Sequence, residues 1–119
     1  MRLIGPALHQ VLDFVTVVTF ALAPSTLGLT GFAATLAYIL AVVHLAMTLL
    51  TKFSPTARRP VPLSLHGAVE AIVGVVLIVL PWLLKWSGTP RIFYIAAGAV
   101  ILLVWGLSQY RAPVSQAAA

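Results

Sequence analysis

The chain has 119 residues, of which 61% are hydrophobic and 8% are charged, and its mean hydropathy is +1.09. This composition excludes an ordinary soluble domain and indicates an integral membrane protein, while the lack of cysteine excludes disulfides and cysteine metal sites. The net charge of +5 comes from cations that flank apolar segments, which is typical of membrane topology and not of a nucleic-acid-binding face.

The first half of the chain predicts two membrane-spanning helices. A helical span needs roughly 20 mostly apolar residues, and the segments from 6 to 27 and from 32 to 51 meet this requirement. Pro6 suits a first helical turn, where its missing N–H is not needed. Pro24 lies near the end of the first segment, so we expect it to kink or end that helix.

A polar linker separates this half from the next. The segment KFSPTARRPVP, residues 52–62, holds three prolines and three cations and predicts an exposed loop. A third helix is expected from 64 to 86, with Ser64 as its N-cap and Pro81 near its end, and a fourth from 91 to 109. The expected organisation is a two-helix repeat at 1–54, a cytoplasmic linker at 55–62, a second two-helix repeat at 63–111 and a tail at 112–119.

The polar residues of the two halves form a gapless repeat. His9, Asp13 and Pro24 recur 57 positions later as His66, Glu70 and Pro81. Asp13 and Glu70 are the only acidic residues of the sequence. We therefore expect an all-α, polytopic bundle of four transmembrane helices, made of two tandem helical hairpins. A hairpin repeated in the same orientation predicts a pseudo-twofold axis along the membrane normal.

Cations and aromatic residues predict how the bundle sits in a membrane. Five of the seven cations fall on one side, namely Arg2, Lys52, Arg58, Arg59 and Arg111, and this excess predicts that both termini are cytoplasmic. Lys85 and Arg91 fall on the other side. Aromatic side chains prefer the two membrane interfaces. The expected interface anchors are Trp82, Trp86, Tyr94, Trp105 and Tyr110.

The second half resembles the SPW-repeat family of small bacterial membrane proteins. The segment VGVVLIVLPWLLKWSG, residues 73–88, holds the Pro-Trp pair at Pro81 and Trp82, and IAAGAVILLV, residues 95–104, is similar to the family's second helix. The first half keeps the proline alone, at Pro24, and Leu80 replaces the motif's serine in the second half. The resemblance implies two-helix repeats in a bacterial inner membrane and no catalytic residues.

A candidate buried polar cluster follows from helix geometry. Residues four apart share a helix face, so His9 lies beside Asp13 and His66 beside Glu70. At 1.5 Å per residue, Glu70 lies about 9 Å and His44 about 12 Å from the linker side. Because a buried carboxylate costs roughly 2.5–3.5 kcal/mol in a membrane, these five residues need partners. A structural hydrogen-bonded cluster, a proton or ion site and a contact with a partner protein all remain open.

The expected function is that of a non-catalytic structural or accessory subunit of a larger membrane assembly. Its partners would be the lipid bilayer and other membrane proteins or further copies of itself. The alternative is a small proton, ion or solute transporter that acts as an oligomer through the polar cluster. A membrane enzyme or a haem protein ranks last, because His44 has Ile101 as its repeat counterpart and lacks a symmetric mate. We expect no catalytic, cofactor-binding or metal-binding residues.

Overall fold

The computed structural model describes residues 3–54 and 56–108. In this part of the chain there are four α-helices: α1 (Pro6–Leu27), α2 (Gly31–Leu50), α3 (Leu63–Leu83) and α4 (Gly88–Leu107). Each helix has 20 to 22 residues and is long and apolar enough to cross a membrane. At 1.5 Å per residue this gives about 30–33 Å, close to the hydrocarbon thickness of a bilayer. The prediction of four membrane-length helices is confirmed.

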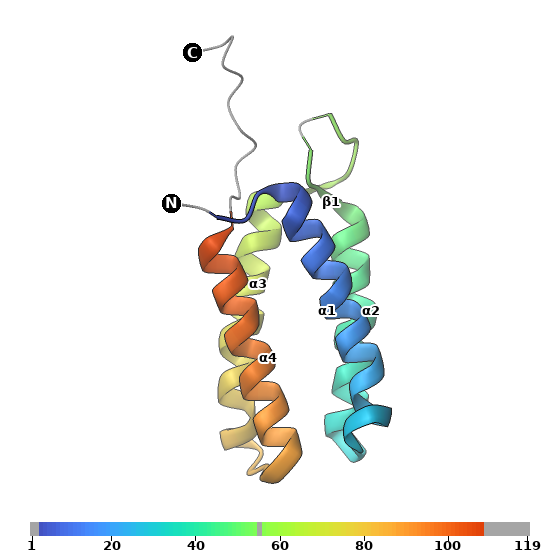
Figure 1. Ribbon diagram of the computed structural model, residues 1–119, viewed down its shortest axis with the longest axis vertical. Coiled ribbons are helices and arrows are strands. Elements are labelled where there is room, and N and C mark those ends of the chain that lie inside the picture. The colour runs from blue at the N-terminus through green and yellow to red at the C-terminus, as the bar shows by residue number, and fades with distance from the viewer. Residues whose placement is uncertain (1–2, 55, 109–119) are drawn as a thin grey trace.

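The helices form two hairpins that stand side by side (Figure 1). Helix α1 packs along α2, and α3 packs along α4. The approach of α3 and α4 is very close, since a Cβ atom added at Gly98 would lie 2.6 Å from the backbone oxygen of Gly74. Small residues allow this kind of helix contact in a membrane protein. Gly74 and Gly98 are thus the residues at which α3 and α4 approach most closely.

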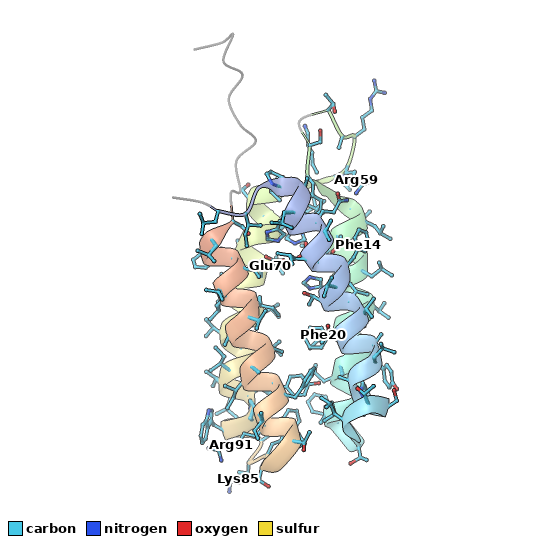
Figure 2. The ribbon with its side chains drawn as sticks, in the orientation of Figure 1. Phe14, Phe20, Arg59, Glu70, Lys85 and Arg91 are labelled. Atoms are coloured by element: carbon cyan, nitrogen blue, oxygen red, sulfur yellow. The ribbon has the colours of Figure 1, made fainter. Side chains whose placement is uncertain are left out.

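The two hairpins also touch each other at the end away from the linker. The Tyr94 hydroxyl of α4 donates a hydrogen bond of 2.6 Å to the backbone oxygen of Ala33 in α2. The rings of Phe20 in α1 and Phe93 in α4 meet edge to face, with 5.8 Å between their centroids. Figure 2 shows Phe20 pointing into the space between the hairpins. These contacts close one end of the interface, and a polar cluster occupies the other.

The turns within the two hairpins have closely similar backbones. Gly28 and Lys85, which are 57 positions apart, both adopt left-handed φ angles of 67° and 56°. The amide N–H after each donates to a proline carbonyl, from Leu29 to Pro24 and from Trp86 to Pro81. Both prolines therefore lie inside the last turns of their helices.

The helix limits in the second half differ from those expected. Helix α3 ends at Leu83 and not at 86, because the left-handed residue Lys85 interrupts the helical backbone. Its N-cap is Pro62 and not Ser64. Helix α4 begins at Gly88 and not at 91, since Pro90 fits within a first turn that does not need its N–H.

Short backbone pairings at the linker end bring distant segments together. Strand β1 (Thr51–Lys52) pairs in parallel with β2 (Val61–Pro62), and Ile4 forms an isolated parallel bridge with Ser108. Thr51 is thereby held beside the start of α3, and Ser108 beside the start of α1. The sequence did not predict these pairings, which place two hydroxyl groups next to the polar cluster.

Candidate functional site

Five ionisable side chains gather between the hairpins near the linker end of the bundle. Helix α1 contributes His9 and Asp13, α2 contributes His44, and α3 contributes His66 and Glu70. Four of them are almost completely buried, with exposed fractions of 1% for His9 and His66, 2% for Asp13 and 5% for Glu70. Figure 2 shows Glu70 in the upper part of the space between the hairpins. The structure thus brings together every member of the cluster suggested by the sequence.

Each of the two most buried imidazoles contacts both carboxylates. The Nε2 atom of His66 lies 3.0 Å from Asp13 Oδ2 and 2.9 Å from Glu70 Oε1. The Nε2 atom of His9 lies 3.3 Å from Asp13 Oδ1 and 3.1 Å from Glu70 Oε2. The two i,i+4 pairs expected within α1 and α3 are present, and two further contacts cross from one hairpin to the other. The cluster therefore joins the hairpins.

Two hydroxyl groups bind the opposite nitrogens of these rings. His66 Nδ1 lies 2.6 Å from Thr51 Oγ1, and His9 Nδ1 lies 2.7 Å from Ser108 Oγ. Each hydroxyl also donates to a backbone oxygen in the last turn of the helix that its residue caps, at Met47 in α2 and at Val104 in α4. A hydroxyl has a single hydrogen, so each must accept its second hydrogen bond from the histidine. We therefore assign the Nδ1 hydrogen to both rings.

Hydrogen on Nδ1 leaves the Nε2 atoms of His9 and His66 to face the centre of the cluster. A neutral imidazole carries one N–H, so a ring with hydrogen on Nδ1 has a lone pair on Nε2. In both rings, Nε2 is the atom that faces the carboxylates. Two lone-pair atoms at about 3 Å repel one another unless a positive species lies between them. The centre is therefore built to hold protons on the rings or a cation between the four groups.

His44 lies at the edge of the cluster and is partly exposed. Its Nε2 atom is 3.4 Å from Asp13 Oδ1 and 3.9 Å from Glu70 Oε1. With His66 and Glu70 it lines a small cavity of about 30 Å³. This volume is enough for about one water molecule. The cavity thus borders two residues of the buried centre, His66 and Glu70, as well as His44.

Phe53 covers the cluster on the linker side. Its side chain is buried, and its ring centroid lies 5.3 Å from that of His66 and 6.0 Å from that of His9. Helix periodicity and the repeat did not predict a role for this residue in the cluster. The apolar ring shields the charged groups from the linker end, which strengthens the interactions among them because the local dielectric is low.

Thr51 and Ser108 are the functional candidates that sequence reasoning missed. They had no visible link to the histidines, because each hydroxyl reaches a histidine of the other hairpin and not of its own. One signal was present: Thr51 and Ser108 are 57 positions apart, as are His9 and His66. Extending the repeat to hydroxyl residues at the helix ends would have found the pair.

The expected interface anchors take several different environments. Trp82 is 56% exposed, and the Arg91 guanidinium stacks 3.8 Å from the centroid of its ring. Trp105 is also exposed. Tyr94 differs from the expected interface anchor, because its side chain is fully buried and faces the other hairpin. Its hydroxyl donates there to the backbone carbonyl of Ala33. Tyr110 lies outside the described residues.

Trp86 packs between the two hairpins. Its ring centroid lies 5.1 Å from that of Tyr94 in α4 and 6.2 Å from that of Phe32 in α2. Aromatic side chains pack favourably against one another in tilted or edge-to-face arrangements. Trp86 therefore contributes to the same end of the interface as Tyr94.

Comparisons with protein families, curated proteins and solved structures find no match for this chain. The resemblance to the SPW-repeat family remains a prediction from the residues quoted above. Function must accordingly be argued from the site.

Proposed function

We propose that the chain is a non-catalytic integral membrane protein that serves as a structural or accessory subunit of a larger membrane assembly. The observation that carries this proposal is the mutual contact of the four buried residues His9, Asp13, His66 and Glu70 across the two hairpins. Carboxylates cost roughly 2.5–3.5 kcal/mol at the centre of a membrane helix. In this protein the contacts with His9 and His66 compensate that cost. Because these contacts connect the two hairpins, they support a structural role for the charged groups.

We further propose that the two hairpins arose by duplication and are related by a pseudo-twofold axis along the membrane normal. Support comes from contacts that recur after 57 positions in both partners. The His9–Ser108 contact has its equivalent in His66–Thr51, and each histidine reaches the hydroxyl of the other hairpin. Such an exchange makes each hairpin incomplete without the other.

The proposed location is a bacterial inner membrane with the linker end in the cytoplasm. Among the described residues, Lys52, Arg58 and Arg59 lie at the linker end, and Lys85 and Arg91 lie at the opposite end. Figure 2 labels Arg59, Lys85 and Arg91 at these two ends. An excess of cations marks the cytoplasmic side. The imbalance in this part of the chain is three to two and supports the same orientation as the whole sequence.

A partner protein has an apolar surface available to it. A groove of about 410 Å³ lies between α1 and α4, lined by residues such as Leu12, Val15, Phe20, Ala96, Val100 and Val104. Large apolar side chains are exposed on all four helices. Helices associate within membranes through close van der Waals packing, which small residues favour. The groove, which Ala96 and Ala97 help to line, therefore suits a span of a partner protein.

The experiment that tests this role is purification in a mild detergent after mild in-membrane cross-linking. The proposal predicts that the chain co-purifies in fixed ratio with one or more larger membrane proteins. A chain that is recovered alone after cross-linking, at native expression levels, contradicts the subunit role.

A second candidate function is conduction of protons or small ions. Two observations favour it: the water-sized cavity beside His44, and an Asp13 Oδ2 atom that accepts no hydrogen bond from any described residue. The double variant Asp13→Asn with Glu70→Gln separates the two functions in proteoliposomes. A structural cluster predicts lower thermal stability without a specific flux defect, whereas a conducting one predicts a folded protein that has lost its flux.

A further inference from the structure

We propose that His9, Asp13, His66 and Glu70 bind one divalent transition-metal ion of the first row, with zinc as the representative ion. The sequence alone had predicted no metal. The inference goes beyond the subunit role and does not depend on a partner. It follows from how four ligand groups from α1 and α3 are arranged around one point.

The four ligand groups converge on one point. One potential ligand atom from each of the four residues lies within 4.8 Å of the other three. The closest nitrogen–oxygen separations are 2.9 Å for His66 with Glu70 and 3.0 Å for His66 with Asp13. Those of His9 are 3.1 Å with Glu70 and 3.3 Å with Asp13.

These separations fit the spacing of ligands around a single ion. Ligands at about 2.0–2.2 Å from a tetrahedral zinc ion lie about 3.3–3.6 Å from each other. An octahedral arrangement at about 2.1 Å gives neighbours about 3.0 Å apart. The four nitrogen–oxygen distances, 2.9 to 3.3 Å, lie close to the octahedral value, and only the longest of them, between His9 and Asp13, reaches the tetrahedral range.

The two imidazoles are oriented as metal ligands. Both rings donate their Nδ1 hydrogen to a hydroxyl, at Thr51 and at Ser108, and turn Nε2 toward the carboxylates. Metal-binding histidines are held in this way, with one nitrogen on the ion and the other N–H on an oxygen acceptor. The hydroxyls in turn are fixed by hydrogen bonds to their own helices. The ligands are therefore oriented before any ion arrives.

One carboxylate oxygen of Asp13 has no hydrogen-bond donor among the described residues. Its Oδ2 atom is buried and lies 3.0 Å from His66 Nε2, yet it forms no hydrogen bond within residues 3–54 and 56–108. With its hydrogen on Nδ1, the neutral ring of His66 has only a lone pair at Nε2, which lies within 3.0 Å of two carboxylate oxygens. Even a doubly protonated ring has one N–H there, which can point well at only one of those oxygens. A metal ion accepts all of these lone pairs at once, because coordination is not limited to a single direction.

Charge and donor type identify the class of ion. Two carboxylates with two neutral imidazoles carry a charge of −2, which one divalent cation cancels inside the membrane. Calcium and magnesium prefer sites built from oxygen alone, whereas imidazole suits zinc, iron, nickel and copper. His44, whose Nε2 is 3.4 Å from Asp13 Oδ1, serves as a positioning residue for that carboxylate.

The test uses the full-length protein in detergent, stripped with a chelator and then exposed to zinc chloride. We expect one zinc ion per chain to remain after desalting, and no retention of magnesium under the same conditions. Zinc-edge X-ray absorption should show a first shell of nitrogen and oxygen at about 2.0–2.1 Å with the scattering of two imidazoles. Failure to retain zinc, or a first shell without two imidazoles, overturns the proposal.

Variants assign the bound ion to this cluster. Asp13→Asn and Glu70→Gln should each weaken zinc binding at least about 10-fold. Loss of a residue that only hydrogen-bonds a metal ligand already has an effect of about this size. Thr16→Val is the matched control, because Thr16 lies on α1 and donates only to Leu12 within its own helix. Equal zinc affinity in Asp13→Asn and Thr16→Val contradicts the site. The absorption measurement on the unaltered chain decides the question if a variant does not fold, and co-purification of partners tests the subunit role separately.

Discussion

The hydroxyl of Thr51 offers the sharpest test of how the cluster is held. Replacing Thr51 by valine keeps the shape of the side chain but removes the oxygen that accepts from His66 Nδ1 at 2.6 Å. Both side chains are fully buried, so the ring N–H loses its partner and gains no water. Leaving a buried donor unsatisfied costs about 1–3 kcal/mol. We expect Thr51→Val to lower the free energy of unfolding by that amount.

Thr48 provides a matched control one turn away on α2. It is equally buried, and its hydroxyl donates to the backbone oxygen of His44, which belongs to the same helix. Thr48→Val should therefore change the free energy of unfolding by no more than about 0.5 kcal/mol, as a hydroxyl bonded back to its own helix adds little. The assay is equilibrium unfolding in mixed micelles with increasing sodium dodecyl sulfate. Equal losses for the two variants would refute the assignment of the Nδ1 hydrogen to His66.

Two predictions concern the packing of the helices. Gly98→Ala should destabilise the protein by about 1–3 kcal/mol in the same unfolding assay, because the added methyl would meet the backbone oxygen of Gly74 at 2.6 Å. Gly106→Ala should cause a smaller loss, as a Cβ there meets no atom of residues 3–54 and 56–108 within 4 Å, and an equal loss at both positions would contradict the close approach. Tyr94→Phe removes the hydrogen bond between α4 and α2 and should cost about 0.5–1.5 kcal/mol in thermal unfolding. The exposed Tyr38 is its control, and a Tyr38→Phe variant of equal effect would count against the buried contact.

The sequence was sufficient to predict the four helices and their membrane length. Long apolar runs separated by turn residues determine these elements locally, and the expected first helix agrees with α1 at both ends. The limits of α3 and α4 were less accurate. They depend on the left-handed backbone at Lys85, which a non-glycine residue rarely adopts and which composition does not reveal.

The cluster could be predicted only in part. Helix periodicity placed His9 beside Asp13 and His66 beside Glu70, and the cost of a buried carboxylate required that they have partners. The individual contacts between the hairpins could not be predicted, because they depend on how α1 and α3 face one another. Ser108 reaches His9 across 99 positions of sequence, a relation that no local pattern encodes.

The burial of Tyr94 illustrates the same limit. An aromatic residue near a helix end suits a membrane interface, and the sequence offered no reason to place it elsewhere. Its actual environment depends on the carbonyl of Ala33, which belongs to the other hairpin. Tertiary packing, and not local pattern, decided the position.

The central claim is that the buried acidic pair joins the two hairpins through shared histidines. A double-mutant cycle of Asp13→Asn, Glu70→Gln and the combined variant, measured by equilibrium unfolding, tests it most directly. Because both carboxylates contact His9 and His66, the account predicts that the two losses do not add, with a coupling free energy of about 0.5–3 kcal/mol. Additive effects within about 0.3 kcal/mol would show that the two carboxylates act independently, and would contradict a single cluster that holds the hairpins together.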